Sequence, residues 1–578
     1  MADMDVQQMM RPQNNKFRKA VEIKGPWYIS FYGKNKKIKI PVPASWNEIF
    51  PGRRDFLGPA VYTTRFGVPA AAKGSQVYLR FGSVNYLARV SVNGIYLGSH
   101  EGGNLPFEIV VPPSALKKSN LLKVEVDGAL AQDRVPPGNV VFDGRDAFAN
   151  RQYPETSFDF FPYCGIHRKV FLCERPERAI DDITVKTLTD GKDGILKVSI
   201  KTSFSGGATA CFELKGFGKV IKISAAVKHC RAAVSIRVKN AKLWNTEKPN
   251  LYTLTAKLNS YGRDIDEYKL LTGIRTVSIK GSRLLINNKP VFLKGFGRHE
   301  DYPGTGRGFS HAWNEIDFKL MKWAGANSFR TSHYPYDEEQ MDMADRSGLM
   351  VIDETPAVGM FFNSAGLKKR VELCRQYVRE MIARDKNHAC VIMWSLANEP
   401  HSNRPAAGEF FKRLAGLAHS LDDTRPATIA SYLGAGEKAF KYLDAVCVNR
   451  YLGWYTQQGR LDLALPMLSQ DLDAIHKKFG KPVILTEFGA DALPGTRAKN
   501  PEMFSEDYQA AMIKGYLDIA AKKTFVAGAH VWNMCDFKTG QGIHRPGGMN
   551  WKGVFTRERK PKLAAYLLRS LWRKRKAK

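Results

Sequence analysis

The stretch Cys390-Val-Ile-Met-Trp-Ser-Leu-Ala-Asn-Glu-Pro400 decides the fold prediction for the larger part of this chain. It begins as a short apolar run and ends on the polar residues Asn398 and Glu399. A short apolar run of this kind is typical of a strand that is buried on both faces. Amphipathic stretches at 368–383 and 407–421 flank it and have the periodicity of helices. The stretch therefore indicates a strand–helix unit.

The same alternation is repeated from about residue 290 to the C-terminal end of the 578-residue chain. Eight apolar runs lie at 291–295, 326–330, 350–353, 390–394, 427–430, 445–448, 482–485 and 527–532. Further helical patterns lie at 315–323, 337–347, 505–521 and 564–572. Eight strand–helix units are typical of a (β/α)₈ barrel. A doubly wound sheet is disfavoured, because it would want fewer units and the chain contains no phosphate-binding G-x-x-x-x-G-K-[ST] motif.

The residues before about 310 contain patterns of strands and no long helical pattern. Alternating runs surround Asn93-Gly94, a pair that favours a tight hairpin because both turn positions need φ > 0. The character of the chain changes near Cys173-Glu-Arg-Pro-Glu-Arg178. Short strands are then expected at 183–186, 195–200, 232–238 and 251–258, a spacing that suits a small β-sandwich. We therefore expect three domains, over residues 1–176, 177–277 and 278–578.

The composition is that of a globular protein and excludes disordered, collagenous and coiled-coil classes, with 44% hydrophobic and 25% charged residues. The formal net charge of +32 attracts anions, so a nucleic acid, an acidic polymer or a small acidic substrate are candidate partners. A basic, solvated enzyme surface explains the charge equally well. No apolar window reaches the ~20 residues of a membrane span, and residues 1–19 lack the apolar run of a signal peptide.

The eight cysteines form no C-x-x-C pair, and several lie within apolar runs. We expect buried free thiols in a reducing compartment, which indicates a cytoplasmic protein.

Polar or ionisable residues follow nearly every predicted barrel strand, where the active sites of such barrels lie. Glu399 follows the fourth strand and Glu487 follows the seventh, so the two carboxylates are expected to face each other across the barrel mouth. Paired carboxylates carry out glycoside hydrolysis, one protonating the leaving oxygen and the other attacking the sugar or activating water. Asn398, beside Glu399, is placed to hydrogen-bond a sugar hydroxyl.

Several motifs resemble glycoside hydrolase family two and, within it, the β-glucuronidases. They are Trp394-Ser-Leu-Ala-Asn-Glu-Pro400, Thr486-Glu-Phe-Gly489, Asn327-Ser-Phe-Arg-Thr-Ser-His-Tyr-Pro-Tyr336, Gly297-Arg-His-Glu-Asp301, Asn449-Arg-Tyr-Leu-Gly-Trp-Tyr455, Val531-Trp-Asn-Met-Cys-Asp-Phe537 and Phe158-Asp-Phe-Phe161. The resemblance extends over nearly the whole chain. It implies an N-terminal jelly-roll sugar-binding domain, an immunoglobulin-like sandwich and a catalytic TIM barrel.

The resemblance also implies a retaining double displacement with Glu399 as acid/base and Glu487 as nucleophile. It implies no cofactor and no metal. Retaining carboxylates lie about 5–5.5 Å apart. Glu399 needs a raised pKa to hold its proton and Glu487 a lowered one, which Arg330 could supply.

The substrate prediction depends on Asn550-Trp551-Lys552, since glucuronidases grip the C6 carboxylate of the sugar with an Asn-x-Lys pair. A neutral sugar would leave Lys552 without its counter-ion. Arg545 is a second candidate partner of the carboxylate, although its spacing to Asn550 exceeds the family pattern by one residue. The remaining positions that match the family's sugar subsite are Asp159, His333, Asn449, Tyr451, Tyr455 and Trp532, with His299 in a supporting position.

These residues imply an exo-β-glucuronidase that releases glucuronate from small glucuronides or from glucuronate-capped oligosaccharides, expected as a homo-oligomer without nucleic-acid or membrane partners. A β-galacturonidase needs the same carboxylate grip, and another family-two β-glycosidase is a further alternative. The alternative outside enzymes is a polyanion-binding protein, suggested by the net charge and the basic tail Arg573-Lys-Arg-Lys-Ala-Lys578. No DNA- or RNA-binding motif accompanies that tail.

Overall fold

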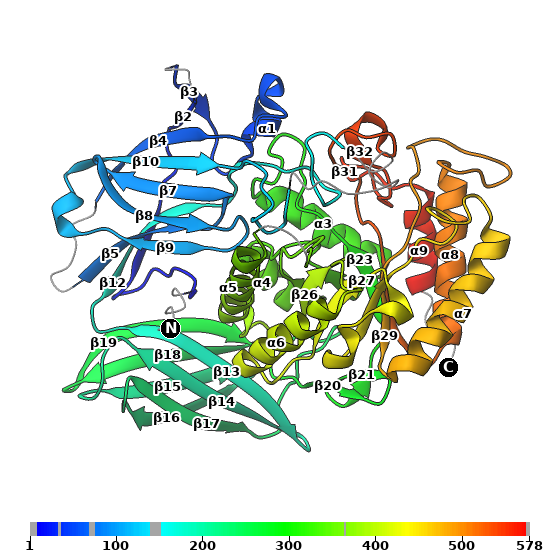
Figure 1. Cartoon of the computed structure of the whole chain (residues 1–578). Helices are drawn as coiled ribbons and strands as arrows, with labels where there is room; N and C mark the ends of the chain where they lie inside the picture. The colour runs from blue at the N-terminus through cyan, green and yellow to red at the C-terminus, as the bar shows by residue number, and fades with distance from the viewer. Residues whose placement is uncertain (1–8, 33–35, 69–74, 139–151, 363–365, 574–578) are drawn as a thin grey trace.

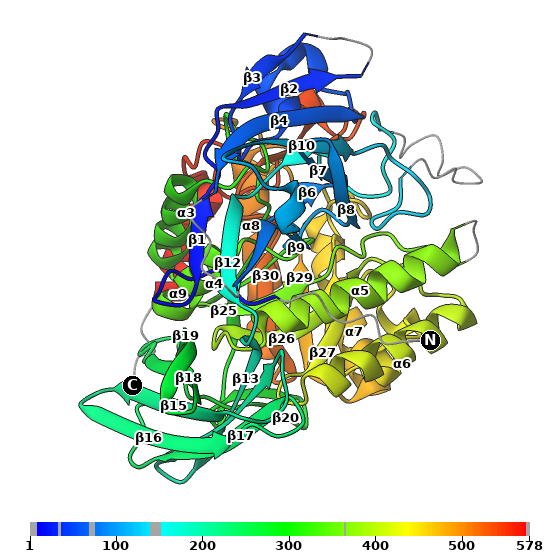
Figure 2. The same cartoon turned by 90° about the vertical axis from the view of Figure 1, so that its left-hand side faces the viewer.

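A computed structural model describes residues 9–32, 36–68, 75–138, 152–362 and 366–573, so Lys574–Lys578 of the basic tail lie outside the described residues. Three domains follow one another along the chain. Two β domains lie on one side of the molecule and the barrel on the other (Figure 1). A second view shows the N-terminal domain and the middle domain at opposite ends, with barrel helices between them (Figure 2).

The N-terminal domain is a sandwich of two antiparallel sheets around one apolar core. The larger sheet has the order β3 (Ile38–Ile40), β2 (Trp27–Phe31), β4 (Ala60–Gly67), β10 (Ser119–Asp127), β7 (Leu87–Val92) and β8 (Ile95–Glu101). The smaller has the order β1 (Lys19–Glu22), β12 (Val170–Pro176), β5 (Ser75–Phe81) and β9 (Phe107–Val110). The short α1 (Trp46–Ile49) and the pair β6 (Val84–Asn85) and β11 (Gly165–Ile166) complete it. This architecture confirms the expected jelly-roll class.

The predicted hairpin is present between β7 and β8. Val92 pairs with Ile95, and Asn93 and Gly94 have φ angles of 52° and 88°. Both turn residues therefore adopt the left-handed conformation that the Asn-Gly pair favours.

The middle domain is a second sandwich, with its own apolar core. One sheet has the order β13 (Ile180–Asp190), β14 (Asp193–Thr202) and β17 (Arg231–Val238). The other has the order β16 (Lys219–Ala226), β15 (Thr209–Gly216), β18 (Tyr252–Ser260) and β19 (Arg263–Thr272). The sandwich was expected, but β15, β16 and β19 were not. β16 is an edge strand with no fully buried residue, so its sequence lacks a clear alternating signal.

A small three-stranded sheet leads into the barrel and consists of β20 (Val277–Lys280), β21 (Arg283–Ile286) and β22 (Lys289–Pro290). The barrel is closed and parallel, as predicted. Its strands are β23 (Leu293–Gly297), β24 (Ser328–Arg330), β25 (Met350–Glu354), β26 (Val391–Asn398), β27 (Ala427–Ser431), β28 (Val446–Asn449), β29 (Val483–Glu487) and β30 (Val526–Val531). The antiparallel pair β31 (Phe537–Lys538) and β32 (Met549–Asn550) follows β30 and lies above the barrel in Figure 1.

The barrel helices include all those that the sequence predicts. They are α3 (His311–Ala324), α4 (Glu338–Ser347), α5 (Leu367–Asp385), α6 (Pro405–Leu421), α7 (Leu461–Phe479), α8 (Glu506–Lys522) and α9 (Leu563–Arg573). The helix α7 was not expected. Pro466 lies inside it and cannot donate to the carbonyl of Asp462, which weakens the helical signal. Buried residues such as Leu468 and Leu472 still give α7 an apolar face against the barrel.

All eight cysteines are free. Six are buried as expected, whereas Cys211 is half-buried and Cys230 is exposed, so the expectation of burial is wrong for Cys230. Cys230 directly precedes β17 and lies in an exposed turn. Within the described residues, no helix combines the length and apolarity that a membrane crossing requires.

Candidate active site

A cavity of about 460 Å³ lies at the C-terminal ends of the barrel strands. Nine of the predicted site residues line it: Asp159, His333, Asn398, Glu399, Tyr451, Tyr455, Glu487, Trp532 and Arg545. Asp159 comes from the segment between β10 and β11 of the N-terminal domain. The cavity is therefore built from two domains, with the barrel supplying both predicted catalytic carboxylates.

Glu399 directly follows β26 and has a φ angle of 46°. A positive φ is uncommon outside glycine, and such strained positions cluster at active sites. The backbone N–H of Glu399 donates to the carbonyl of Ala430 on β27, with 2.8 Å between N and O. Asn449 Nδ2 donates to Glu399 Oε1 at 2.8 Å. Burial raises the pKa of Glu399, although the Asn449 hydrogen bond and the Arg330 charge oppose this shift.

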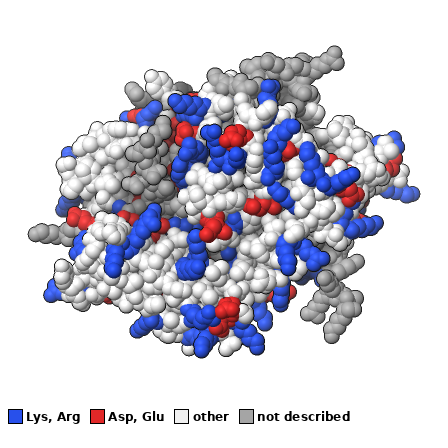
Figure 3. Space-filling model, turned by 60° about the horizontal axis from the view of Figure 1, so that its bottom comes forward, with Lys and Arg blue, Asp and Glu red and all other residues white. Residues whose placement is uncertain are grey.

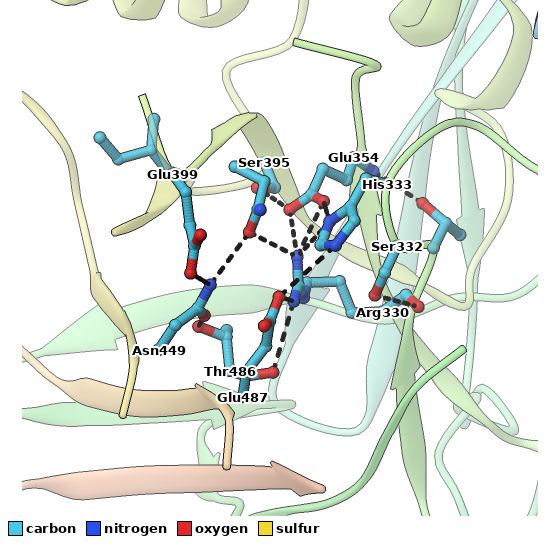
Figure 4. A network of polar contacts seen from close by, with 12 residues as sticks. Arg330, Ser332, His333, Glu354, Ser395, Glu399, Asn449, Thr486 and Glu487 are labelled. Atoms are coloured by element: carbon cyan, nitrogen blue, oxygen red, sulfur yellow. Dashed lines mark hydrogen bonds and ion pairs between the residues drawn. The ribbon is translucent and has the colours of Figure 1, made fainter. Parts of the chain in front are cut away.

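Glu487 is the last residue of β29 and is held by three side chains (Figure 4 shows two of them). Arg330 donates to Glu487 Oε1, and Tyr451 Oη donates to Oε2 at 2.7 Å. His333 Nε2 lies 3.6 Å from Oε1. Burial raises the pKa of Glu487, and the Arg330 guanidinium and the nearby His333 ring oppose this shift. The expectation of a lowered pKa is therefore wrong in direction, because desolvation outweighs the predicted effect of Arg330.

Arg330 is fully buried at the end of β24 and connects both catalytic strands. Its Nη1 donates to both Glu354 carboxylate oxygens at 2.8 Å and to Asn398 Oδ1 at 3.3 Å. His333 Nδ1 lies 2.8 Å from Glu354 Oε1, and Ser395 Oγ donates to Glu354 Oε2 at 2.7 Å (Figure 4). One guanidinium thus bridges Glu354 and Glu487 and holds Glu487 in a defined orientation.

Glu354 is a site residue that the sequence prediction did not select. Burial would raise its pKa, but Arg330 and His333 hold that pKa below its ordinary value. Its position in the sequence could have identified Glu354 as a site residue. Asp353 and Glu354 end the third predicted strand in the same way as Asn398 and Glu399 follow the fourth.

A second polar cluster surrounds Arg545, which also lines the cavity. Arg545 Nε donates to Asp159 Oδ1 at 2.8 Å, and its Nη2 donates to Tyr455 Oη at 2.9 Å. Asn550 Nδ2 donates to Asp159 Oδ2 at 2.9 Å. Burial would raise the pKa of Asp159, but Arg545, Lys552 and Asn550 together hold it below its ordinary value. Asp159 is therefore an anion that is already paired across the domain boundary.

Lys552 is buried behind this cluster. Its Nζ donates to Asp491 Oδ2 at 2.7 Å, and Nζ lies 4.9 Å from the centre of the Tyr455 ring. Asp491 is 3.8 Å from Arg545 Nη1 as well. The expectation that Lys552 lacks a counter-ion without an acidic sugar is therefore wrong, because Asp491 supplies one. Asp491 lies four residues after Glu487, in the loop that follows the seventh strand. This position is the one feature of the sequence that could have indicated Asp491 as a site residue.

The other predicted residues lie one layer behind the cavity wall. The described lining residues do not include His299, Arg330, Asn449, Asn550 or Lys552. His299 Nδ1 lies 3.1 Å from Tyr334 Oη, and burial lowers the pKa of His299. Its ring lies 5.3 Å from that of Trp532, which in turn stacks on His333 with ring centres 4.9 Å apart. His299 thus packs against Trp532, which lines the cavity, while His299 itself is not among the described lining residues.

Potential metal ligands converge at the opposite end of the barrel, which the sequence spacing did not reveal. Single ligand atoms of Asp345, His388 and Cys390 lie within 4.8 Å of one another. The Asp345 carboxylate already accepts from the Cys390 backbone N–H at 2.7 Å and lies 2.6 Å from His388 Nδ1. Cys390 precedes β26 and Glu399 follows it, so the strand separates this group from the catalytic carboxylates.

Comparisons with known proteins cover the same three parts of the chain. Residues 2–176 match the family described as glycosyl hydrolases family 2, sugar binding domain; 179–275 match glycosyl hydrolases family 2; and 277–577 match its TIM barrel domain. The β-glucuronidase of Paenibacillus borealis is 41% identical over 93% of this chain and 91% of its own length.

Two solved structures resemble the whole fold. The β-D-glucuronidase of Dictyoglomus thermophilum superposes with a TM-score of 0.90 and 38% identity, covering 98% of this chain and 99% of that one. The β-glucuronidase of Ruminococcus gnavus in complex with D-glucaro 1,5-lactone superposes with a TM-score of 0.91 and 33% identity, covering 98% and 100%. With all three domains matched and identity above 30% over nearly the full length, this chain belongs to glycosyl hydrolase family 2.

Proposed function

We propose that this chain is a retaining exo-β-glucuronidase, which hydrolyses β-D-glucuronides to glucuronate and an aglycone or a shortened glycan. The observation that carries the proposal is the pair of carboxylates, half-buried Glu399 and buried Glu487, which line one cavity together with Arg545. The named β-glucuronidases that align with almost the whole chain support the same activity.

The two carboxylates have different surroundings, which suit different roles. Burial raises the pKa of Glu399 in the direction that a general acid needs, but it raises the pKa of Glu487 as well, so the hydrogen-bond partners are what distinguish the two. Glu487 has each oxygen oriented by a donor, Arg330 on one and Tyr451 on the other. The cation at Arg330 opposes the effect of burial and favours the ionised nucleophile.

In the proposed reaction, Glu487 attacks the anomeric carbon while Glu399 transfers its proton to the glycosidic oxygen, whose bond to that carbon breaks. The aglycone leaves as the alcohol, and glucuronate stays bonded to Glu487 as an ester. Glu399, now ionised, takes a proton from water as that water attacks the anomeric carbon, which releases Glu487. Two inversions retain the β configuration.

The sugar carboxylate is proposed to meet Arg545 first, because Arg545 lines the cavity whereas Asn550 and Lys552 lie behind it. The cluster contains two cations, Arg545 and Lys552, and two anions, Asp159 and Asp491. It is therefore formally neutral before substrate binds. The carboxylate of the sugar would accept charge-assisted hydrogen bonds from Arg545. Asp159 would then share Arg545 with the substrate and become available to accept hydrogen bonds from sugar hydroxyls.

A β-galacturonidase remains the nearest alternative, since it differs only at the C4 hydroxyl, where Asp159 and Tyr455 are the candidate contacts. Polyanion binding is the alternative outside enzymes. On the face in Figure 3, Lys and Arg side chains are spread over the surface with Asp and Glu among them. This mixed pattern favours a basic solvated surface over one continuous anion-binding groove.

Initial rates on p-nitrophenyl β-glucuronide, β-galacturonide and β-galactoside, measured side by side, test the proposal. We expect the glucuronide to have the highest kcat/KM and the galactoside the lowest. Faster hydrolysis of the galacturonide would assign the alternative substrate, and no hydrolysis of any of the three would contradict the enzyme assignment.

We further propose that the protein is cytoplasmic, which its free cysteines support, and that it forms a homo-oligomer. Size measurement in solution by light scattering checks the second statement.

A further inference from the structure

The part of the cavity next to Glu399 has a chemistry different from that around Arg545. His401 and Tyr432 line the cavity there, together with Val358, which pairs with Asn398. His401 lies two residues beyond Glu399, and Tyr432 directly follows β27, the strand that hydrogen-bonds to β26. These side chains therefore lie on the barrel wall that carries the proposed acid/base.

The two rings form a supported aromatic surface. Tyr432 Oη lies 3.5 Å from His401 Nδ1, and the ring centres are 6.3 Å apart. Phe361 stacks under His401 with ring centres 4.8 Å apart and planes 25° apart. The backbone carbonyl of Tyr432 accepts a 2.7 Å hydrogen bond from Arg450 Nη1, and the N–H of His401 donates to the Met360 carbonyl at 2.9 Å. The backbones of both residues are thus held in place, and 42% of Tyr432 is exposed to solvent.

The position of this surface follows from the proposed reaction. Glu399 must reach the glycosidic oxygen, so the leaving group lies beside Glu399. Tyr432 also lies close to Glu399. Burial is the largest cause of the raised pKa of Tyr432, and the negative charge of Glu399 is the second largest. The rings of His401 and Tyr432 therefore lie where the leaving group binds.

The described residues that line this part of the cavity include no lysine or arginine. Among the described residues that line the cavity, Arg545 is the one lysine or arginine, and Asp159 pairs with it at the sugar side. Burial lowers the pKa of His401 and raises that of Tyr432, so near neutral pH both rings are without charge. Among the described lining residues, an acidic second sugar would find no lysine or arginine beside Glu399, whereas a flat apolar ring finds two aromatic side chains.

We propose that this protein selects glucuronides with a flat, uncharged aromatic aglycone, which packs against His401 and Tyr432. This inference rests on the proposed function, because it uses the role of Glu399 to identify the leaving-group side. It disfavours the glucuronate-capped acidic oligosaccharides that the sequence allowed as substrates.

The inference is tested with analogues in which sulfur replaces the glycosidic oxygen, so that the enzyme does not cleave them. Their binding then reports contacts with the aglycone and does not depend on how readily the aglycone leaves. Dissociation constants are measured by calorimetry for phenyl β-thioglucuronide, for cyclohexyl β-thioglucuronide of similar size, and for a thio-linked disaccharide of two glucuronates. We expect the phenyl compound to bind about fivefold more tightly than the cyclohexyl one, the order that aromatic pairs add beyond burial. The acidic disaccharide should bind least tightly.

Variants assign the preference to the two rings. Tyr432→Ala and His401→Ala should each bring the phenyl-to-cyclohexyl ratio close to one, while Tyr432→Phe keeps it because the ring remains. Tyr261→Ala is the matched control, since Tyr261 is 93% exposed in the middle domain. Circular dichroism of each variant checks its folding.

Three results would overturn the inference: equal binding of the phenyl and cyclohexyl compounds, an unchanged ratio in both alanine variants, or tightest binding of the acidic disaccharide. Hydrolysis of p-nitrophenyl β-glucuronide is measured in parallel. If hydrolysis is absent but the ring-dependent preference is present, the proposed function fails and the aromatic binding surface stands.

Discussion

The ion pairs around Glu487 join residues of one domain, whereas the ion pairs around Arg545 join residues of two domains. Arg330, Glu354 and Glu487 all come from the ends of barrel strands. Asp159 comes from the N-terminal domain, and its partner Arg545 comes from a loop beyond β31. The difference teaches that the catalytic carboxylates depend on the closed barrel, while the proposed substrate selection depends on how two domains meet.

Removal of either catalytic carboxylate should have the largest effect. Glu399→Ala and Glu487→Ala should each lower kcat by several orders of magnitude, because each change removes a proton-transfer or a covalent role. Azide distinguishes the two with an activated aryl glucuronide. It should give a β-azide with Glu399→Ala and an α-azide with Glu487→Ala. The opposite pair of products would show that the roles are reversed.

Loss of Lys552 should have the next largest effect and separates selectivity from stability. Lys552→Ala should lower kcat/KM for the glucuronide by about 2–4 kcal/mol, the scale of a lost charge-assisted contact. It also removes the closer of the two cations beside buried Asp491 and leaves Arg545 Nη1 at 3.8 Å, so the loss of unfolding free energy should stay below the about 3–5 kcal/mol of a fully unpaired buried charge. Activity on the matching glucoside should change little. Urea unfolding and kcat/KM on both substrates measure the two effects.

The double variant Lys552→Met with Asp491→Asn is the control for that prediction. It removes both charges, so most of the unfolding free energy should return while the glucuronide activity stays low. If glucuronide and glucoside activities fall equally in both variants, the Arg545 cluster supports the fold and does not select the substrate.

The smallest expected effect is a shift of the pH profile on the Glu399 side. Asn449 donates to the charged form of Glu399 and so lowers its pKa. Asn449→Ala should therefore raise that pKa further, and the acid form should persist to higher pH. The alkaline limb of kcat should move upward by about one unit, the equivalent of about 1.4 kcal/mol. The acid limb, which reports Glu487, is the internal control. An unmoved alkaline limb would contradict the role of Asn449.

The barrel was predictable because its strands are continuous apolar runs and its catalytic residues directly follow them. The pattern around Cys390–Pro400 contains both signals in one stretch. The strand β16 and the helix α7 escaped because an exposed edge strand and an internal proline weaken the periodicity. The strands β15 and β19 were missed as well, although some of their side chains are buried, so local patterns predicted the barrel more completely than the middle sandwich.

The charge pairing was less predictable, because ion pairs join residues that are distant in sequence. Asp159 and Arg545 are 386 residues apart, and Lys552 and Asp491 are 61 apart. No local pattern tells which anion a buried lysine will meet. The direction of the Glu487 pKa was missed for a related reason, since the sequence indicated the cation but not the extent of burial.

Trapping of the covalent intermediate tests the central claim most directly. The protein is incubated with 2-deoxy-2-fluoro-β-D-glucuronyl fluoride, digested with a protease and examined by tandem mass spectrometry. A fluoroglucuronyl ester on Glu487 is the predicted result. A label on Glu399 or on another residue would contradict the assignment of Glu487 as the nucleophile. Unlabelled protein that hydrolyses glucuronides with inversion would contradict the double displacement itself.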